Sequence, residues 1–468
     1  MTDIPDTTSA GPVPENQRLG TLDLLRGFAL LGIFMVNMQF FAMFFGEFIR
    51  PAVYGGGPVI DAVAWGFVKA FFEYKFISLF SLLFGAGMVV QMSRAKAKGR
   101  PFIPTYLRRM AVLAVIGLVH GYLLWYGDIL FIYSLIGTAL LLARKWRPRT
   151  LLITAGSIIV FFFVVQLAIG VVFFGSTGGF DADDAANDAA SPQPVAAVVQ
   201  DEREPEQEPD PETDPETDPE LWSEKNPKLA GRFPWMAAMF DSRFDITSDR
   251  WRDAETTAYK EGPYTDALAF RAFTYTIAIL LAVFGYGWRV LAMFLIGAAL
   301  MKLGVFAASA GPWHRRLFFI GMGLGVPAEL ANAWLTYVAA GERIGLAFLG
   351  ATLHEPGSLL MCLGFVGGAG MIVSSGIMPR LVRAISAVGR LALSNYLLQT
   401  VVATFLMYSW GLGYFGDVPR PWQIALVLAI YLLQIPLSLL WLRYFTIGPM
   451  EWIWRSLTYN KRQPMRRL

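Results

Sequence analysis

Apolar residues run in long uninterrupted stretches along the chain, and short polar or glycine-containing connections separate them. A helix needs about 20 apolar residues to cross the hydrocarbon core of a bilayer. Eleven stretches approach this length: residues 22–45, 76–92, 106–125, 129–142, 151–174, 268–286, 290–306, 317–338, 359–373, 392–408 and 424–442. The pattern therefore predicts an all-α, polytopic membrane bundle of about 10–11 transmembrane helices.

Polar segments divide this predicted bundle into five parts. Residues 1–18 lack the basic start and apolar core of a cleavable signal peptide, so we expect a disordered N-terminal tail there. The other parts are a bundle of about five helices (19–175), an extracytoplasmic loop (176–266), a second bundle of about five or six helices (267–447) and a basic cytoplasmic tail (448–468).

The composition supports insertion into a membrane. Hydrophobic residues make up 55% of the chain and charged residues only 16%, whereas soluble domains carry about 25% charge. This excludes an ordinary soluble enzyme and a nucleic-acid binder that works through a basic surface. Three histidines and one cysteine exclude a His-rich metal centre and an intramolecular disulfide, so no metal site is expected.

The acidic segment, residues 180–221, differs from its surroundings. It carries fifteen Asp or Glu and one Arg, a net charge of −14, so the remaining residues carry +17 against +3 for the whole chain. High charge, many prolines and few apolar residues prevent such a segment from burying enough surface to fold. We expect a solvated linker; the alternative is an acidic brush that binds cations or a partner. Residues 222–263 mix aromatic with charged residues and are predicted to be helical at the outer membrane surface.

The short loops predict the orientation. Residues 93–101, 143–149 and 454–468 are rich in Lys and Arg, and such loops stay in the cytoplasm. This places the N-terminus inside and the acidic segment outside. Eleven spans would leave the basic C-terminal tail outside, so ten spans are preferred. One of the two stretches within residues 268–306 is then expected to be re-entrant or interfacial.

The best candidates for chemistry are His120 and Asp128. His120 lies in the outer half of one predicted helix, and Asp128 opens the next helix after a tight turn at Tyr126 and Gly127. A carboxylate beside an imidazole holds one tautomer, as a general base requires. Trp125 and Tyr133 lie near this pair in the sequence. The alternative is a histidine that only binds a neighbouring helix.

The first predicted helix carries Arg26 and Asn37 on one face. They are eleven residues apart, which is three helical turns or about 16 Å. Arg26 can bind a phosphate or carboxylate from the cytosolic side; the alternative is an arginine that reaches the interface and pairs with Asp23. Asn37 lies deep in the span, where bridging to another helix is its default role.

Other polar residues in the spans carry weaker signals. Glu329 and Asn332 lie one turn apart after a proline, where they can line a cavity, relay a proton or bond between helices. His354 and Glu355 are expected in a loop at the outer mouth of a span. Lys75 is expected as an interfacial anchor.

In a later span, Asn395 and Gln399 lie one turn apart, and amide bonds between helices are the default for them. The chain contains no P-loop, no HExxH zinc motif and no nucleophile elbow. It also shows no convincing inverted repeat of the kind found in many secondary transporters.

Four segments carry a resemblance to a known family: residues 22–37, 75–88, 117–130 and 389–467. They resemble the YeiB-like family of bacterial inner-membrane proteins, the group named domain of unknown function 418. The likeness spans nearly the whole chain apart from the N-terminal tail and the acidic segment. It implies a multi-pass protein of the bacterial inner (plasma) membrane.

A more distant resemblance concerns mechanism. The family resembles transmembrane acyltransferases, including acyltransferase-3 proteins and heparan-glucosaminide N-acetyltransferase, which pass an acyl group from cytosolic acyl-CoA to an acceptor across the membrane. Acyltransferase-3 proteins carry an Arg and a His in the first helix; Arg26 matches, but Asn37 stands in the His position, as in the heparan-type enzymes. This departure makes His120 the substitute base.

Two functions follow as hypotheses. In an acyltransferase, His120 and Asp128 would be the catalytic pair, acyl-CoA a co-substrate rather than a bound cofactor, and a sugar or lipid head group the acceptor. The candidate binding residues are Arg26, Asn37, Arg108, Arg109, Trp125, Glu329 and Asn395. In a proton-coupled transporter, Glu329, His120 and Asp128 would together form a path for protons or substrate. A cytosolic groove that reaches His120 would favour the acyltransferase, and two gated vestibules would favour the transporter. A scaffold whose polar residues are only structural is a third option. The lipid bilayer is the expected partner, and no nucleic acid is.

Overall fold

The computed structural model describes residues 20–49, 59–176, 221–339 and 344–466. The predicted N-terminal tail and residues 180–220 of the acidic segment lie outside the described residues. Within the described ranges every regular element is a helix, which confirms the predicted all-α class.

The helices of the first half are α1 (Gly20–Ala42), α2 (Phe45–Ile49), α4 (Val59–Phe71), α5 (Lys75–Ala97), α6 (Phe102–Val119), the π-helical turn η2 (His120–Leu124), α7 (Leu130–Leu140), the 3₁₀ turn η3 (Leu141–Ala143) and α8 (Pro148–Ser176). A group of short helices follows: α10 (Trp222–Lys225), α11 (Pro227–Arg232), α12 (Pro234–Asp241), α13 (Asp249–Thr256) and the π-helical turn η4 (Thr257–Glu261). The second half contains α14 (Tyr264–Leu281), the π-helical turn η5 (Ala282–Tyr286), α15 (Gly287–Lys302), α16 (Gly311–Ala339), α17 (Ile344–Ser375), α18 (Pro379–Arg390), α19 (Ala392–Met407), α20 (Arg420–Tyr444) and α21 (Pro449–Tyr459).

Ten helical units of the described residues are apolar enough to form the membrane part. Eight are long enough to cross a bilayer: Gly20–Ala42, Val59–Ala97, Phe102–Leu124, Pro148–Val172, Tyr264–Lys302, Gly311–Ala339, Gly345–Ser375 and Arg420–Tyr444. Two shorter apolar helices, Leu130–Ala143 and Ala392–Met407, accompany them. Residues 268–286 and 290–306, predicted as separate stretches, fall largely within one continuous unit, Tyr264–Lys302.

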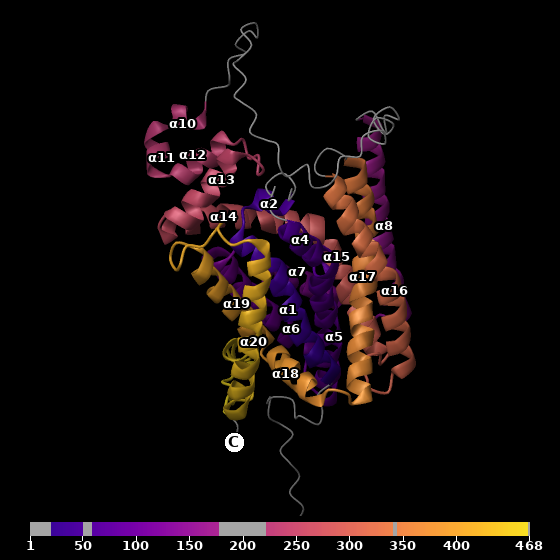
Figure 1. Cartoon of the computed structure of the whole chain (residues 1–468). Coiled ribbons are helices and arrows are strands. Elements are labelled where there is room, and N and C mark those ends of the chain that lie inside the picture. Colours follow the sequence, from indigo (N-terminus) through magenta and orange to yellow (C-terminus); the bar gives the residue numbers. More distant parts are fainter. Residues whose placement is uncertain (1–19, 50–58, 177–220, 340–343, 467–468) are drawn as a thin grey trace, which may run out of the picture.

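Within this unit, α14 and α15 take different courses. α14 runs across the upper end of the bundle in Figure 1 and contacts η2 and η4, whereas α15 descends beside α5. One of the two stretches therefore lies across the end of the bundle, as the preference for ten spans requires. Hydrogen bonds from α14 to the preceding hairpin hold this course: Tyr264 and Arg271 donate to the carbonyl of Leu123 in η2, and Tyr275 donates to that of Gly117 in α6.

Different helices lie at the two ends of the bundle. α18, α21 and the C-terminal residues lie at the lower end in Figure 1, which we call the basic end. The short helices α10 to α13 lie at the other end, which we call the opposite end. They confirm the predicted helical segment after the acidic region, and Trp235 and Trp251 pack their rings against Phe270 of α14.

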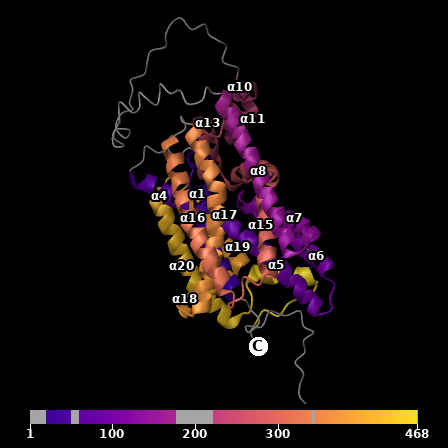
Figure 2. The same ribbon diagram turned by 90° about the vertical axis from the view of Figure 1, so that its right-hand side faces the viewer.

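Several outer helices present apolar side chains outward. In Figure 2, α16 and α17 form a long pair, and α8 contacts both α15 and α17. Phe161 of α8 and Leu432 of α20 are more than half exposed. Such surfaces are stable when lipid covers them, so this exposure fits a membrane-embedded bundle.

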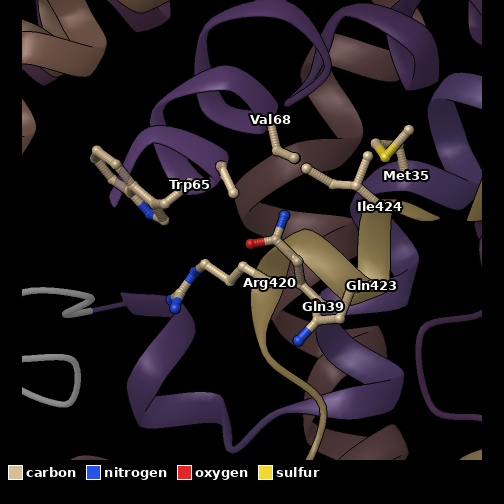
Figure 3. A pocket seen from close by; sticks show the side chains of 8 residues that line it. Met35, Gln39, Trp65, Val68, Arg420, Gln423 and Ile424 are labelled. Atoms are coloured by element: carbon tan, nitrogen blue, oxygen red, sulfur yellow. The ribbon is translucent and has the colours of Figure 1, made fainter. Parts of the chain in front are cut away.

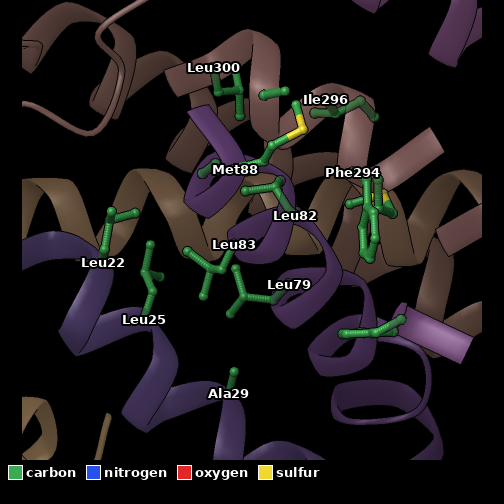
Figure 4. Close-up of a cluster of buried hydrophobic side chains, with 14 of the residues drawn as sticks. Leu22, Leu25, Ala29, Leu79, Leu82, Leu83, Met88, Phe294, Ile296 and Leu300 are labelled. Carbon is green, nitrogen blue, oxygen red and sulfur yellow. The ribbon is translucent and has the colours of Figure 1, made fainter. Parts of the chain in front are cut away.

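α5 and α15 pack closely against each other inside the main apolar cluster of the described residues (Figure 4). A Cβ at Gly297 would lie 1.8 Å from the carbonyl oxygen of Leu82, and one at Gly85 would lie 1.9 Å from that of Phe294. Only glycine permits this approach of two backbones, a common packing mode between membrane helices. At the opposite end, α1, α4 and α20 surround a small hollow (Figure 3).

Candidate functional site

His120 and Asp128 lie in direct contact, as the hairpin pattern predicted. His120 Nδ1 is 2.8 Å from Asp128 Oδ1, and His120 Nε2 is 3.0 Å from Thr400 Oγ1 of α19. The second oxygen, Asp128 Oδ2, accepts from the backbone N–H of Phe131 at 2.9 Å and from Tyr275 OH at 3.3 Å. We call His120, Asp128, Tyr275 and Thr400 the histidine site; its four side chains are buried.

The local sequence explains how the pair forms. α6 passes into the π-helical turn η2 at His120, and Trp125 adopts an extended conformation that starts the return to α7. Asp128 then binds the backbone N–H of Phe131 at the start of α7. Gly117 allows the hairpin to close, because a Cβ there would lie 2.4 Å from the backbone nitrogen of Phe131.

Aromatic rings surround the imidazole. The ring of Tyr396 lies 5.1 Å from that of His120, and the ring of Trp125 lies 6.4 Å away. Trp125 also packs at 4.2 Å against Phe41 of α1, and its buried Nε1 has no hydrogen-bond partner within the described residues. The imidazole therefore has one fixed polar partner on each nitrogen inside an apolar shell.

This geometry defines the chemistry that the pair can perform. A carboxylate that accepts from Nδ1–H leaves Nε2 as the basic nitrogen, and Nε2 faces a hydroxyl group. A buried imidazole with this tautomer can take a proton from a hydroxyl or amine. Thr400 and Tyr275 carry no signal that links them to His120, since each lies far along the chain among several polar residues of its own helix.

A second polar group lies between α5, α16 and α17. Lys75 Nζ is 2.8 Å from Glu329 Oε2, and His354 Nδ1 is 3.0 Å from the same oxygen. Asn332 Nδ2 donates to it at 3.1 Å. We call Lys75, Glu329, Asn332 and His354 the ion cluster. Lys75 was expected as an interfacial anchor, but it is fully buried in the protein. Its Nζ also donates to the carbonyl of Lys69 at 2.8 Å, which helps to compensate for the loss of water.

The ion cluster corrects two further sequence expectations. His354 and Glu355 lie within α17 instead of a loop. Glu355 pairs with Arg289 of α15, and Arg289 also donates to Ser78 at 3.3 Å and Ser358 at 2.6 Å. Arg289 gives no sign in the sequence of being a buried partner, because it lies in the short polar connection between two apolar stretches.

The arginines proposed for phosphate binding lie at the basic end. Arg26 pairs with Asp23 at 3.0 Å, and its side chain is 32% exposed. Arg108 donates to the carbonyl of Thr458 at 3.2 Å, and the guanidinium of Arg109 stacks 3.6 Å from the ring centre of Trp454. Both contacts tie α6 to α21.

Arg455 of α21 adds a further cation beside them. Burial lowers the pKa of its guanidinium, whereas the Glu451 carboxylate and Tyr459 raise it; Arg26 is a further charge that lowers it. Glu451 itself accepts from the backbone N–H groups of Leu393 and Ser394 at the start of α19. Its carboxylate is thus held by α19, and positive charge predominates in this part of the basic end.

The remaining predicted residues are not joined to the histidine site. Asn395 donates to the carbonyl of Val388 and to Ser438 Oγ, each at 3.1 Å, so both amide hydrogens are already used. Gln399 donates to Gln434 Oε1 at 2.9 Å, as expected for an amide bond between helices. Asn37 is half-buried on α1. Within the described ranges, no group of three His, Cys, Asp or Glu can hold a metal ion.

Bacterial proteins are similar to this chain over nearly its whole length. It is 31% identical over 454 residues to "Uncharacterized protein YeiB" of Escherichia coli strain K12, covering 96% of this chain and 98% of the relative. It is 30% identical over 466 residues to "Uncharacterized protein YxaH" of Bacillus subtilis strain 168, covering 98% of each. The family model for proteins of unknown function DUF418 matches residues 300–461. The chain belongs to the DUF418 family. No solved structure matches it.

The DUF418 match begins near the end of α15 and ends just after α21. It contains Glu329 and His354 of the ion cluster and Thr400 of the histidine site. His120 and Asp128 precede it, in the part of the chain covered by the long similarity to YeiB and YxaH. Both polar groups therefore involve the segment that characterises the DUF418 family.

Proposed function

We propose that this DUF418 protein is a membrane-embedded acyltransferase, with acyl-CoA as donor and a hydroxyl or amine as acceptor. The observation that supports this best is the histidine site: a buried imidazole whose Nδ1 faces a carboxylate and whose Nε2 faces a hydroxyl. This is the arrangement of a general base beside an attacking oxygen.

The reaction follows from these contacts. Asp128 holds the Nδ1–H tautomer, and His120 Nε2 takes the proton of the acceptor as its oxygen or nitrogen attacks the thioester carbonyl. The tetrahedral intermediate then loses the CoA thiolate, which receives the proton from the imidazolium. Thr400 Oγ1, which lies 3.0 Å from Nε2, must move aside for the acceptor atom at this step.

The spacing along α6 supports a donor bound from the basic end. Arg109 and His120 are eleven residues apart, which puts them on one helix face about 16 Å apart. Arg26 and Asn37 repeat this spacing on α1. A phosphate group at the arginines would leave the phosphopantetheine arm to reach toward the imidazole. Guanidinium groups bind phosphate well because their donors match its oxygens.

We further propose that the basic end faces the cytoplasm of a bacterial inner membrane, with the N-terminus inside. Lys- and Arg-rich loops favour the cytoplasmic side. The acceptor then approaches from the opposite end, as an envelope sugar or lipid head group.

The test is acyl-CoA binding to the purified full chain by calorimetry, with acetyl-CoA and longer acyl chains. We expect binding that weakens about 10- to 100-fold in Arg26→Ala or Arg109→Ala, the effect of losing one charged hydrogen bond. Arg316→Ala, an exposed arginine of α16, is the matched control. With an acceptor present, His120→Gln should lower the release of free CoA thiol by about 10²- to 10⁴-fold at unchanged binding.

Failure to bind any acyl-CoA would contradict the proposal. The ion cluster would then favour the second candidate, a proton-coupled transporter, because a buried Lys–Glu–His group is a suitable proton site. Glu329→Gln is the variant that tests it: substrate-driven proton movement into vesicles should be lost in Glu329→Gln and kept in Arg316→Ala.

A further inference from the structure

A polar cavity at the opposite end lies apart from the histidine site. Its main chamber has a volume of about 160 Å³ and is lined by Gln39, Phe48, Trp65, Lys69 and Glu73. A cavity needs about 10–15 Å³ of such volume to hold one water molecule, so the chamber has room for a small organic group. A second hollow of about 10 Å³, which we call the narrow arm, shares Gln39 and Trp65 with it.

The narrow arm contains polar atoms without partners. Figure 3 shows Gln39, Arg420 and Gln423 beside Trp65 around this space. Gln423 is only 3% exposed; its amide nitrogen donates to the carbonyl of Val418 at 2.8 Å, but its Oε1 has no hydrogen-bond partner among the described residues. Arg420 Nε is also buried, and it too lacks a partner in the part of the chain that the structure describes. Leaving such an atom unpaired costs about 1–3 kcal/mol, so the arm favours a ligand group that both donates and accepts.

The charges around the cavity balance. Lys69 pairs with Glu73 at 3.1 Å. The backbone N–H of Arg420 donates to Asp61 at 3.0 Å, and its guanidinium donates to the carbonyl of Glu47 at 3.1 Å. Glu47 also lies 3.7 Å from Arg252. Lys69–Glu73 and Arg252–Glu47 are thus ion pairs, and Asp61 already accepts from the backbone of Arg420, so an ionic ligand would disturb existing contacts.

The lining combines features that suit hydroxyl groups. A hydroxyl is both a donor and an acceptor, so it can satisfy Gln423 Oε1 and Arg420 Nε in a space of about one water. The amide of Gln39 and the Lys69–Glu73 pair offer further donors and acceptors in the main chamber. The indole of Trp65 supplies an apolar wall for the C–H face of such a ligand.

We propose that this cavity binds a neutral, polyhydroxylated group about the size of a monosaccharide, with one hydroxyl in the narrow arm between Arg420 and Gln423. The group belongs either to a free sugar or to the head group of a glycolipid. This site is independent of acyl transfer, and no step of the proposed reaction depends on it.

The test uses the full chain in nanodiscs of phosphatidylcholine, because maltoside detergents would themselves occupy the site. Radiolabelled D-glucose is the probe, measured by equilibrium dialysis and displaced by glycerol, glucose 6-phosphate or glucosamine. We expect saturable glucose binding and at least tenfold weaker competition by the charged analogues. Nanodiscs that contain glucosyl diacylglycerol separate the two sources: a tenfold weaker apparent glucose affinity there identifies the lipid head group.

Gln423→Leu and Gln39→Leu should each weaken glucose binding about tenfold or more, the effect of losing one hydrogen bond in a buried site. Gln91→Leu, on α5 toward the basic end, is the matched control and should bind as the parent does. The use of two variants covers the case in which one fails to fold. Absence of saturable glucose binding, equal binding by both cavity variants, or tighter binding of glucose 6-phosphate would overturn the proposal.

Discussion

At the scale of single residues, the Lys75–Glu329 pair shows how this bundle accommodates buried charge. Lys75 and Glu329 are both fully buried and lie 2.8 Å apart, and Asn332 and His354 supply further contacts to the same carboxylate oxygen. Desolvation of either ion alone is costly, and the partner compensates that cost. The two charges are therefore stable inside the protein only as a pair, because each compensates the desolvation cost of the other.

This pairing predicts the behaviour of a double-mutant cycle. Lys75→Met leaves Glu329 buried without its cation and should destabilise the protein by about 3–5 kcal/mol, whereas Lys75→Met combined with Glu329→Gln should recover most of that loss. The measurement is thermal unfolding of the purified protein, followed by size-exclusion chromatography. Lys461→Met, at an exposed position near the C-terminus, is the control. A single Lys75→Met variant with unchanged stability would contradict the prediction.

At the scale of elements, the short helices at the opposite end are attached to the membrane part by mixed contacts. Trp251 of α13 packs against α14, and Glu255 of α13 accepts from the backbone N–H of Phe45 at 3.1 Å. Glu255 is only 5% exposed, and burial raises the pKa of its carboxyl to about 8. The docked helix therefore favours the protonated carboxyl.

The stability of this docking should fall as pH rises. An unfolded carboxyl releases its proton near pH 4.5, while the folded one holds it to about pH 8. Between these values the folded state binds more protons, so stability decreases with pH. Glu255→Gln mimics the neutral form and should remove this slope, raising stability at pH 8 by an amount on the order of a few kcal/mol.

The readout is the difference in Tm between Glu255→Gln and the parent at pH 4 and pH 8. We expect a higher Tm for the variant at pH 8 and little difference at pH 4. Glu261→Gln, at an exposed position on the next turn of chain, controls for the loss of a surface charge. A Tm difference that does not change with pH would show that this carboxyl does not titrate across the range.

At the scale of the whole molecule, the count of membrane units decides where the ends lie. Ten apolar helical units in the described residues bring α1 and the C-terminal helix α21 to the same end. The lateral course of α14 is what reduces eleven stretches to ten units, because a helix that lies across the end of the bundle adds no crossing.

This arrangement predicts a definite topology. A fluorescent protein fused after residue 468 should fluoresce in the cytoplasm, and alkaline phosphatase inserted at residue 200 should be active outside. A matched insertion of alkaline phosphatase at residue 146, in the basic loop before α8, should be inactive. Activity of the phosphatase at residue 146 would reverse the proposed orientation.

The sequence alone determined the properties that depend on local hydrophobicity and short spacing. Apolar stretches identified the membrane helices, because each must satisfy its own backbone hydrogen bonds in lipid. The His120–Asp128 contact was also predictable, since a short hairpin brings neighbouring residues together. Membership of the DUF418 family followed from motifs spread along the chain.

Only the tertiary structure decided which helices face one another. Thr400 beside His120, Tyr275 on Asp128, and Lys75 against Glu329 each join residues far apart in the sequence. Outer faces contact lipid and inner faces contact other helices, and both are apolar, so periodicity cannot distinguish partners. For the same reason the sequence does not reveal the lateral position of α14 or the burial of Arg289. A polar residue in a sequence shows only that it needs a partner, and the packing of the helices determines which partner it finds.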